Sequence, residues 1–388
     1  MGQKKIISIL LVVGVYLLTS AASYTFFAAA NEGGSIVDVP DSKRPKNDFE
    51  QIVFDDGPRT EACPLNGAKY SKAQKSWWEK HRPLGVMIEN HEEARPQSGL
   101  SFADVVYEAV AEGGITRFLA VYYCQDGGIV GPVRSARTYF LDFISEYGSN
   151  PLYAHVGGAN TPGPANALGQ IEDYGWGGYN DLNQFSIGYP TFRRDESRLG
   201  REVATEHTMY STTSKLWDIG RKRDLTNKDE DGNEWDEEFD SYEFKEDASL
   251  SQRGKTKTIY LEFWEGYNAF SVEWTYNKDS NNYSRDNGGE PHKDRNTGKQ
   301  ITAKNVVVLY MTERPANDGY EGNAHRLYGT KGTGDAVIFQ DGKEIEGSWR
   351  KTDRESRLVV TANGKEVKFN RGLIWFEILP TGSPLEVN

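Results

Sequence analysis

The sequence predicts an α+β protein, in which a mixed α/β layered domain at 63–223 precedes a smaller β-rich domain at 257–388. Strand-like and helical hydrophobic patterns alternate in the first region, which is typical of layered α/β folds. The second region consists of short runs rich in β-branched and aromatic residues, separated by turn signals. Between the two regions, residues 224–256 are rich in Asp and Glu and predict an acidic linker.

The first domain contains three predicted strands and two predicted helices. The strands are expected at 84–89, 116–123 and 152–156, and the helices at 138–147 and 213–223. The first helix follows from apolar side chains that recur every three or four residues from Ala136 onward, with Ser135 as N-cap and Gly148 just past the end. A loop at 155–189, rich in Gly, Asn and Pro, is of the kind that often carries function.

The second domain contains six predicted strands joined by tight turns. The strands are expected at 258–263, 271–276, 306–311, 336–339, 358–361 and 373–379. Asp341-Gly342 and Asn363-Gly364 predict hairpin turns, because both dipeptides accept positive φ angles. We therefore expect a small antiparallel barrel or sandwich.

The N-terminal segment indicates export. Two lysines precede an uninterrupted apolar run at 6–19, so residues 1–30 predict either a cleaved signal peptide or, as we favour, an uncleaved membrane anchor. Residues 31–62 then predict a flexible tether. The lysines place the rest of the chain on the extracytoplasmic face of the cell membrane, and cleavage would make it a secreted protein.

Charge and cysteine content restrict the function and the compartment. The formal charge of −12 and the lack of a long basic block exclude a nucleic-acid-binding protein. Cys63 and Cys124 are the two cysteines of the sequence, and in an oxidising compartment they predict one disulfide. The alternative is two unpaired buried thiols.

The run GPVRSAR at 131–137 is the strongest candidate for a binding site. It places Arg134, Ser135 and Arg137 at the start of a predicted helix, where the helix dipole disfavours cations. Free backbone amides, a hydroxyl and two guanidiniums would together bind phosphate or carboxylate. The alternative is that both arginines pair with acids of the same chain.

An acidic stripe lies close by in the sequence. Asp104, Glu108 and Glu112 recur every four residues, which places all three on one side of a helix or strand. They could pair with Arg117, Arg134 and Arg137, which we favour, or hold a divalent cation beside an anionic ligand.

Three histidines next to predicted strand ends form a further candidate set. His91, His155 and His207 could converge on a cleft and act as acid, base or ligand, whereas the alternative is that each simply caps a strand. No H-x-x-x-H or H-E-x-x-H spacing is present, so the sequence does not predict a zinc site.

The acidic linker contains a segment similar to a calcium loop. Asp229, Asp231 and Glu238 stand at its third, fifth and twelfth positions, but Asn227 replaces the first aspartate. Calcium binding and a plain acidic linker are both open, and Ca²⁺ or Mg²⁺ is the only cofactor that the sequence suggests.

Longer motifs resemble those of the YerB-like lipoproteins. The matching segments are Arg82-Pro-Leu-Gly-Val-Met-Ile-Glu-Asn90-His91, Ala94-Arg95-Pro-Gln-Ser-Gly-Leu100, Ala103-Asp104-Val-Val-Tyr-Glu108, Glu112-Gly-Gly-Ile-Thr-Arg117, the run at 131–137, His155 with its glycines, Glu206-His207-Thr-Met-Tyr-Ser211 and parts of 334–380. The resemblance implies a bacterial, chiefly Gram-positive, two-domain envelope protein without an established activity. This chain departs from the family by lacking a lipid-attachment cysteine near its leader, and the loop at 229–238 resembles an insertion.

We therefore expect a membrane-tethered envelope protein that binds an anionic ligand, such as a phosphorylated or acidic glycan. Its expected ligand-binding residues are Asn90, His91, Arg95, Asp104, Glu108, Glu112, Arg117, Arg134, Ser135, Arg137, His155 and His207. In this scheme Asp104, Glu108 and His155 orient the arginines.

Two alternatives differ in class. The first is a metal-assisted phosphotransferase or phosphodiesterase acting on cell-wall precursors, with Asp104 or Glu108 on Mg²⁺. The second is a scaffold that binds other envelope proteins through an aromatic patch around Trp349 or Trp375.

Overall fold

The computed structural model describes residues 51–54, 57–320, 322 and 324–388. The predicted leader at 1–30 and most of the predicted tether lie outside the described residues. Among the residues described, no helix is both long and apolar enough to cross a membrane.

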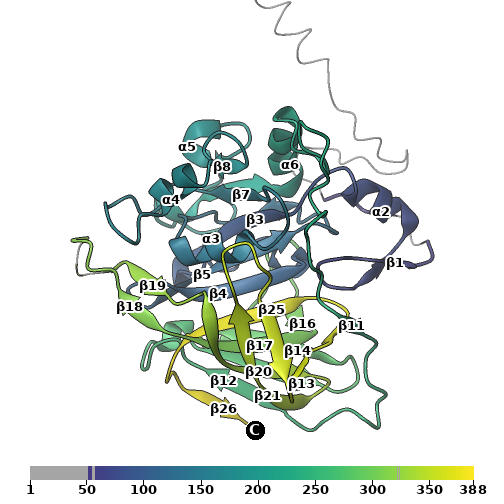
Figure 1. Ribbon diagram of the computed structural model, residues 1–388. Coiled ribbons are helices and arrows are strands. Elements are labelled where there is room, and N and C mark those ends of the chain that lie inside the picture. Colours follow the sequence, from purple (N-terminus) through teal and green to yellow (C-terminus); the bar gives the residue numbers. More distant parts are fainter. Residues whose placement is uncertain (1–50, 55–56, 321, 323) are drawn as a thin grey trace, which may run out of the picture. The chain divides into compact units, whose positions relative to one another are not determined.

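An eleven-stranded sheet runs through the described part of the chain (Figure 1). Its strand order is β23-β22-β21-β20-β17-β25-β4-β5-β3-β7-β8. The strands are β3 (Leu84–Glu89), β4 (Val105–Glu112), β5 (Ile115–Tyr122), β7 (Leu152–His155), β8 (Asp181–Asn183), β17 (Asn305–Met311), β20 (Gly332–Gln340), β21 (Lys343–Lys351), β22 (Val359–Ala362), β23 (Lys365–Glu366) and β25 (Ile374–Pro380). Because β25 pairs in parallel with β4, strands from both predicted domains belong to one sheet.

A second, antiparallel sheet is built from the C-terminal region alone. Its order is β15-β14-β13-β12-β26, with β16 also paired to β14. The strands are β12 (Thr258–Leu261), β13 (Val272–Asn277), β14 (Asn282–Asn287), β15 (Glu290–Pro291), β16 (Thr302–Ala303) and β26 (Leu385–Val387). The indole N–H of Trp274 on β13 donates to Glu377 on β25 at 2.9 Å, so this sheet packs against the large one.

Smaller β pairings complete the strand structure. They are β1 (Glu61–Ala62) with β2 (Lys69–Tyr70), β6 (Ile129–Val130) and β9 (Arg193–Arg194) with β10 (Met209–Thr212), β11 (Phe244–Lys245) with β24 (Phe369–Asn370), and β18 (Glu313–Pro315) with β19 (Arg326–Tyr328). The hairpin of β18 and β19 packs beside helix α3, through contacts of β19.

Helices lie beside the N-terminal strands of the large sheet. They are α2 (Lys72–Trp78), α3 (Thr138–Ile144), α4 (Ala167–Asp173), α5 (Gln184–Ile187) and α6 (Thr213–Lys222), with 3₁₀ turns η1 (Glu92–Ala94), η2 (Leu100–Phe102), η3 (Thr205–His207) and η4 (Asn268–Phe270). Helix α3 packs on β5, and α6 packs on β3 and β7.

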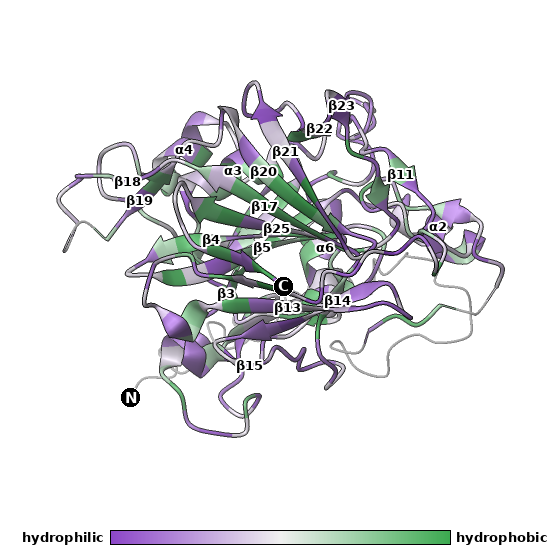
Figure 2. Cartoon of the chain, turned by 90° about the horizontal axis from the view of Figure 1, so that it is seen from below, coloured by the Kyte–Doolittle hydropathy of each residue, from purple (hydrophilic) through white to green (hydrophobic). Residues whose placement is uncertain are grey.

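The core follows the central strands of the large sheet. All residues of β3 are buried, as are nearly all those of β4, β5, β17 and β25. Both faces of these strands are covered, which is why they are continuous apolar runs rather than alternating patterns. Figure 2 shows this as stretches of apolar colour along β4, β17 and β20.

The predicted helix at 138–147 is shorter than expected, and its expected N-cap is wrong. Helix α3 has Arg137 as N-cap, without a side-chain capping bond, and its C-cap is Ser145. The preceding segment is held extended instead, because the Arg134 amide donates to the Met87 carbonyl and the Ala136 amide to the Gly157 carbonyl. Tertiary hydrogen bonds therefore outweigh the capping preference of Ser135.

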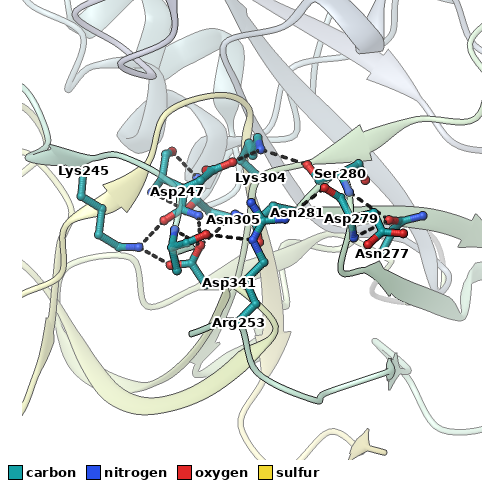
Figure 3. Close-up of polar contacts among 12 residues, drawn as sticks. Lys245, Asp247, Arg253, Asn277, Asp279, Ser280, Asn281, Lys304, Asn305 and Asp341 are labelled. Carbon is teal, nitrogen blue, oxygen red and sulfur yellow. Dashed lines mark hydrogen bonds and ion pairs between the residues drawn. The ribbon is translucent and has the colours of Figure 1, made fainter. Parts of the chain in front are cut away.

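Part of the acidic stretch at 224–256 packs firmly onto the fold (Figure 3). Asp341, in the turn between β20 and β21, accepts hydrogen bonds from the Ala248 amide at 3.1 Å and from Asn281 at 2.8 Å, and it pairs with Lys245. Trp235 is also buried. The end of this stretch is thus tied to the hairpin of the large sheet.

Candidate functional site

Three arginines, of which Arg117 and Arg137 are buried and Arg134 is half-buried, meet at one face of the large sheet. Arg134 Nε lies 3.1 Å from Glu89 Oε1, and Arg117 Nη2 lies 3.5 Å from Glu112 Oε2. Arg137 pairs with the same Glu112. These five residues are called the arginine cluster below.

The arginine cluster has more cationic groups than carboxylates. Three guanidiniums contact two acids, and Glu206 outside the cluster adds a negative charge that acts on Arg134. Nε and Nη1 of Arg117 and Nε of Arg137 are buried without a hydrogen-bond partner among the described residues. Burial also lowers the pKa of all three arginines, because desolvation disfavours their charged form. The side chains of Arg134 and Glu112 are 24% and 27% exposed, so solvent meets the cluster at these two residues. The arrangement is suited to binding an anion.

Side chains alternate between the two faces of the sheet along β3, β4 and β5, and this alternation determines which of the predicted residues lie in the arginine cluster. Glu89 on β3 is directly opposite Arg117 on β5, and directly opposite residues share a face. Asn90 and Glu108 belong to the other face, where Glu108 is opposite Phe118. A register shift between Val110 and Glu112 then returns Glu112 to the face of Arg117. The expectation that the acidic stripe lies on one side is therefore wrong.

Asp104 does not reach the arginines. Its carboxylate accepts the amides of Tyr123 at 2.7 Å and Cys124 at 2.9 Å and the side-chain amide of Asn66 at 2.8 Å. Burial raises the pKa of Asp104 to about 7. The disulfide between Cys63 and Cys124 lies beside it.

Glu108 belongs to a buried network that joins the two regions of the chain. It pairs with Arg285 of β14 and accepts hydrogen bonds from Asn90 at 3.2 Å and Thr116 at 2.7 Å. Arg95 donates to the Asn90 carbonyl and to the Ala269 carbonyl. Glu108, Asn90 and Arg95 therefore lie in this network rather than in the arginine cluster.

His155 acts on the backbone near Arg137. Its Nδ1 lies 2.7 Å from the Gly157 carbonyl, which also accepts the Ala136 amide, and its Nε2 lies 2.5 Å from Asp181 Oδ1. His155 is thus placed to fix the loop that holds the arginine segment.

Three of the backbone amides beside Arg134 are not free. The Val133, Arg134 and Ala136 amides donate to the carbonyls of Met209, Met87 and Gly157. Ser135 is half-buried within this segment. These three amides are therefore not available to an anion, and the charged donors of the site are the guanidiniums.

His91 and His207 come together next to the arginine cluster, without His155. Their rings stack with centroids 4.7 Å apart. His207 Nδ1 lies 2.8 Å from Glu89 Oε2, and the hydrogen bond to this carboxylate raises the pKa of His207. His207 Nε2 lies 3.6 Å from Glu93 Oε2. Glu89 thus contacts both Arg134 and His207.

The predicted calcium-like loop at 227–238 is held by hydrogen bonds between its own residues. Asp229 Oδ1 accepts the amides of Asp231 at 3.0 Å and Asn233 at 2.9 Å. Two groups of three potential metal ligands occur among the described residues, and neither includes Asp229, Asp231 or Glu238.

Sequence reasoning missed Glu89, Glu93 and Arg285 as site residues. Glu89 is a charged residue that ends an otherwise apolar strand, and this was an available signal. Glu93 and Arg285 carry no local signal, because their partners come from distant segments.

The fold and the site define a class of sheet-rich protein that carries a largely buried arginine cluster on its N-terminal strands. Residues 69–226 match "Protein of unknown function (DUF3048) N-terminal domain", and residues 259–376 match the C-terminal domain of that family. The chain belongs to this family.

Two comparisons with YerB agree with this assignment and confirm the predicted resemblance. The chain is 30% identical over 318 residues to "Putative lipoprotein YerB" of Bacillus subtilis (strain 168), covering 82% of this chain and 86% of the relative. A crystal structure of YerB protein from Bacillus subtilis is similar with a TM-score of 0.68 and 25% identity, covering 84% of this chain and 100% of that one.

Proposed function

We propose that this protein binds an anionic group of the cell envelope, a phosphorylated or acidic glycan, through Arg117, Arg134 and Arg137. The observation that carries the proposal is the set of buried guanidinium nitrogens without partners on Arg117 and Arg137. A buried charged donor without an acceptor is unfavourable, and the oxygens of a phosphate or carboxylate would satisfy it.

The relative and the predicted leader support a place of action outside the cytoplasm. The relative from Bacillus subtilis carries the name "Putative lipoprotein YerB", and the leader at 1–30 predicts export. We therefore place the binding region outside the cytoplasm and tethered to the membrane.

Binding is favoured over the two alternatives. The enzymatic alternative assigned Mg²⁺ to Asp104 or Glu108, and both carboxylates are engaged with other groups of the chain. The scaffold alternative invoked a patch around Trp349 or Trp375, and both side chains are buried.

Thermal unfolding of the full chain with and without anions tests the proposal. The probes are inorganic pyrophosphate and polygalacturonate, with sodium chloride at equal ionic strength as the reference. We expect a rise in the melting temperature with at least one probe, because a ligand that binds only the folded state stabilises it. Arg134→Ala should remove this rise, and Arg350→Ala, at an exposed arginine of β21, should keep it.

An equal rise in the Arg134→Ala variant would contradict the assignment of the site. No rise with either probe, in a wild-type chain that unfolds cooperatively, would count against anion binding and favour the scaffold. The melting temperature of each variant without ligand shows whether it is folded.

A further inference from the structure

We propose that His91, His207 and Glu93 form a binding site for Zn²⁺. The ligand atoms of these three side chains all lie within 4.8 Å of one another. His91 is the N-cap of η1, which carries Glu93, and His207 is the last residue of η3. Two 3₁₀ turns from distant parts of the sequence thus converge on one set of ligands that Zn²⁺ prefers.

Glu89 supplies the outer contact that zinc-binding histidines usually have. Its carboxylate lies 2.8 Å from Nδ1 of His207, so Nδ1–H donates to it and Nε2 of His207 is left as the metal-binding atom. This Nε2 points toward Glu93, whose Oε2 lies 3.6 Å away. The ring of His207 is therefore already oriented for coordination.

The three ligands can close around an ion with small movements. Donor atoms of a tetrahedral zinc site lie about 3.3 Å apart, given zinc–nitrogen bonds of about 2.0 Å. The side chain of Glu93 is 52% exposed, and its carboxylate accepts the Ala204 amide at a long 3.4 Å, a contact that a shift toward the metal would give up. His91 Nδ1 accepts the Glu93 amide at 3.2 Å, and metal binding by His91 exchanges this one long contact for a coordinate bond.

Three protein ligands leave a fourth coordination position for water or for an oxygen of a ligand. The site also borders the arginine cluster, because the other oxygen of Glu89 contacts Arg134 at 3.1 Å. The zinc proposal does not depend on anion binding by that cluster.

Zinc titration of the full chain tests the site. Chelator-treated protein is titrated with Zn²⁺ in competition with a chromophoric chelator, and the visible spectrum of the Co²⁺-loaded chain reports the geometry. We expect one Zn²⁺ per chain. Affinity should fall at least about 100-fold in His207→Gln and about 10-fold or more in Glu93→Gln, and about 10- to 100-fold in Glu89→Gln, which removes only the negative charge of the outer contact.

Glu92→Gln is the matched control, because Glu92 is an exposed glutamate next to Glu93 in the same turn. It should bind Zn²⁺ as the wild type does. Wild-type affinity in Glu93→Gln and His207→Gln, or no stoichiometric zinc in the wild type, would overturn the proposal. Should His207→Gln misfold, the exposed Glu93→Gln decides alone. Arg117→Lys should keep zinc affinity even where it loses anion binding, which separates this proposal from the proposed function.

Discussion

Glu108 on β4 and Arg285 on β14 form an ion pair that is fully buried and joins the two family regions. The Arg285 guanidinium also lies 4.8 Å from the ring of Trp375 and 5.5 Å from that of Phe118. The Arg285 guanidinium thus contacts both a carboxylate and aromatic ring faces between the two sheets. The contact connects the strands that carry the arginine cluster to the C-terminal strands.

Arg285→Met should destabilise the protein strongly. It leaves Glu108 as an uncompensated buried charge, which typically costs about 3–5 kcal/mol. Urea unfolding at neutral pH measures the loss. In the double variant with Glu108→Gln much of the stability should return, and a single variant within about 1 kcal/mol of wild type would contradict the role of this pair.

Glu377 on β25 should make the folded protein less stable as pH rises. Its pKa is raised well above 4.5, first by burial and then by repulsion from Glu108, so the folded chain binds a proton that the unfolded chain releases. Native stability from this residue is therefore complete below pH 4.5 and declines as pH rises, by at most about 1.4 kcal/mol per pH unit.

Glu377→Gln removes this decline while its amide oxygen still accepts from Trp274. We expect the variant to gain stability relative to wild type as pH rises from 4.5 to 7, measured by urea unfolding at several pH values. A stability difference that is constant with pH would show that Glu377 is ionised in the folded chain.

Asp341 should stabilise the contact between residues 224–256 and the hairpin of β20 and β21 at neutral pH, and should lose this effect in acid (Figure 3). Although burial opposes ionisation, Lys245, Asn281 and Asn370 together lower the pKa of Asp341 from 3.8 to about 2. The stabilisation is present above pH 3.8 and is lost as pH falls toward 2. Asp341→Asn should therefore cost about 2 kcal/mol at pH 7 and little near pH 2.

Asparagine is a matched replacement there because the φ angle of Asp341 is 54°, a left-handed value that Asn tolerates. Chemical unfolding at both pH values measures the difference. The interpretation fails if the variant loses as much stability at low pH as at neutral pH.

Strands and turns could be predicted from local sequence. The run at 84–89 coincides with β3, because buried strands between turn residues are continuous apolar runs. The predicted turn residues Asp341 and Asn363 have φ angles of 54° and 52°, which confirms the hairpin prediction.

The site could be predicted only in part. Arg117, Arg134 and Arg137 do come together, but Glu108 and Glu112 lie on opposite faces, because the β-bulge between Val110 and Glu112 is invisible in the four-residue spacing. Glu108 and Arg285 are 177 residues apart, and no periodicity reports such a pairing. The N-cap of α3 is Arg137 rather than Ser135, because backbone hydrogen bonds to Met87 and Gly157 hold the preceding segment extended.

Glu112→Gln tests whether excess positive charge in the arginine cluster drives anion binding. This prediction rests on the proposed function. Glu112 contacts both Arg117 and Arg137, so the substitution removes one of two negative charges while keeping a hydrogen-bond acceptor. A bound pyrophosphate would then lose a repulsive neighbour, and we expect its affinity to rise roughly tenfold at low ionic strength. Isothermal titration of the full chain measures this change. Glu346→Gln, at an exposed glutamate of β21, changes net charge equally and should leave affinity unaltered. Weaker binding in Glu112→Gln would mean that Glu112 is needed chiefly to hold the two guanidiniums in place, and that excess positive charge does not drive binding.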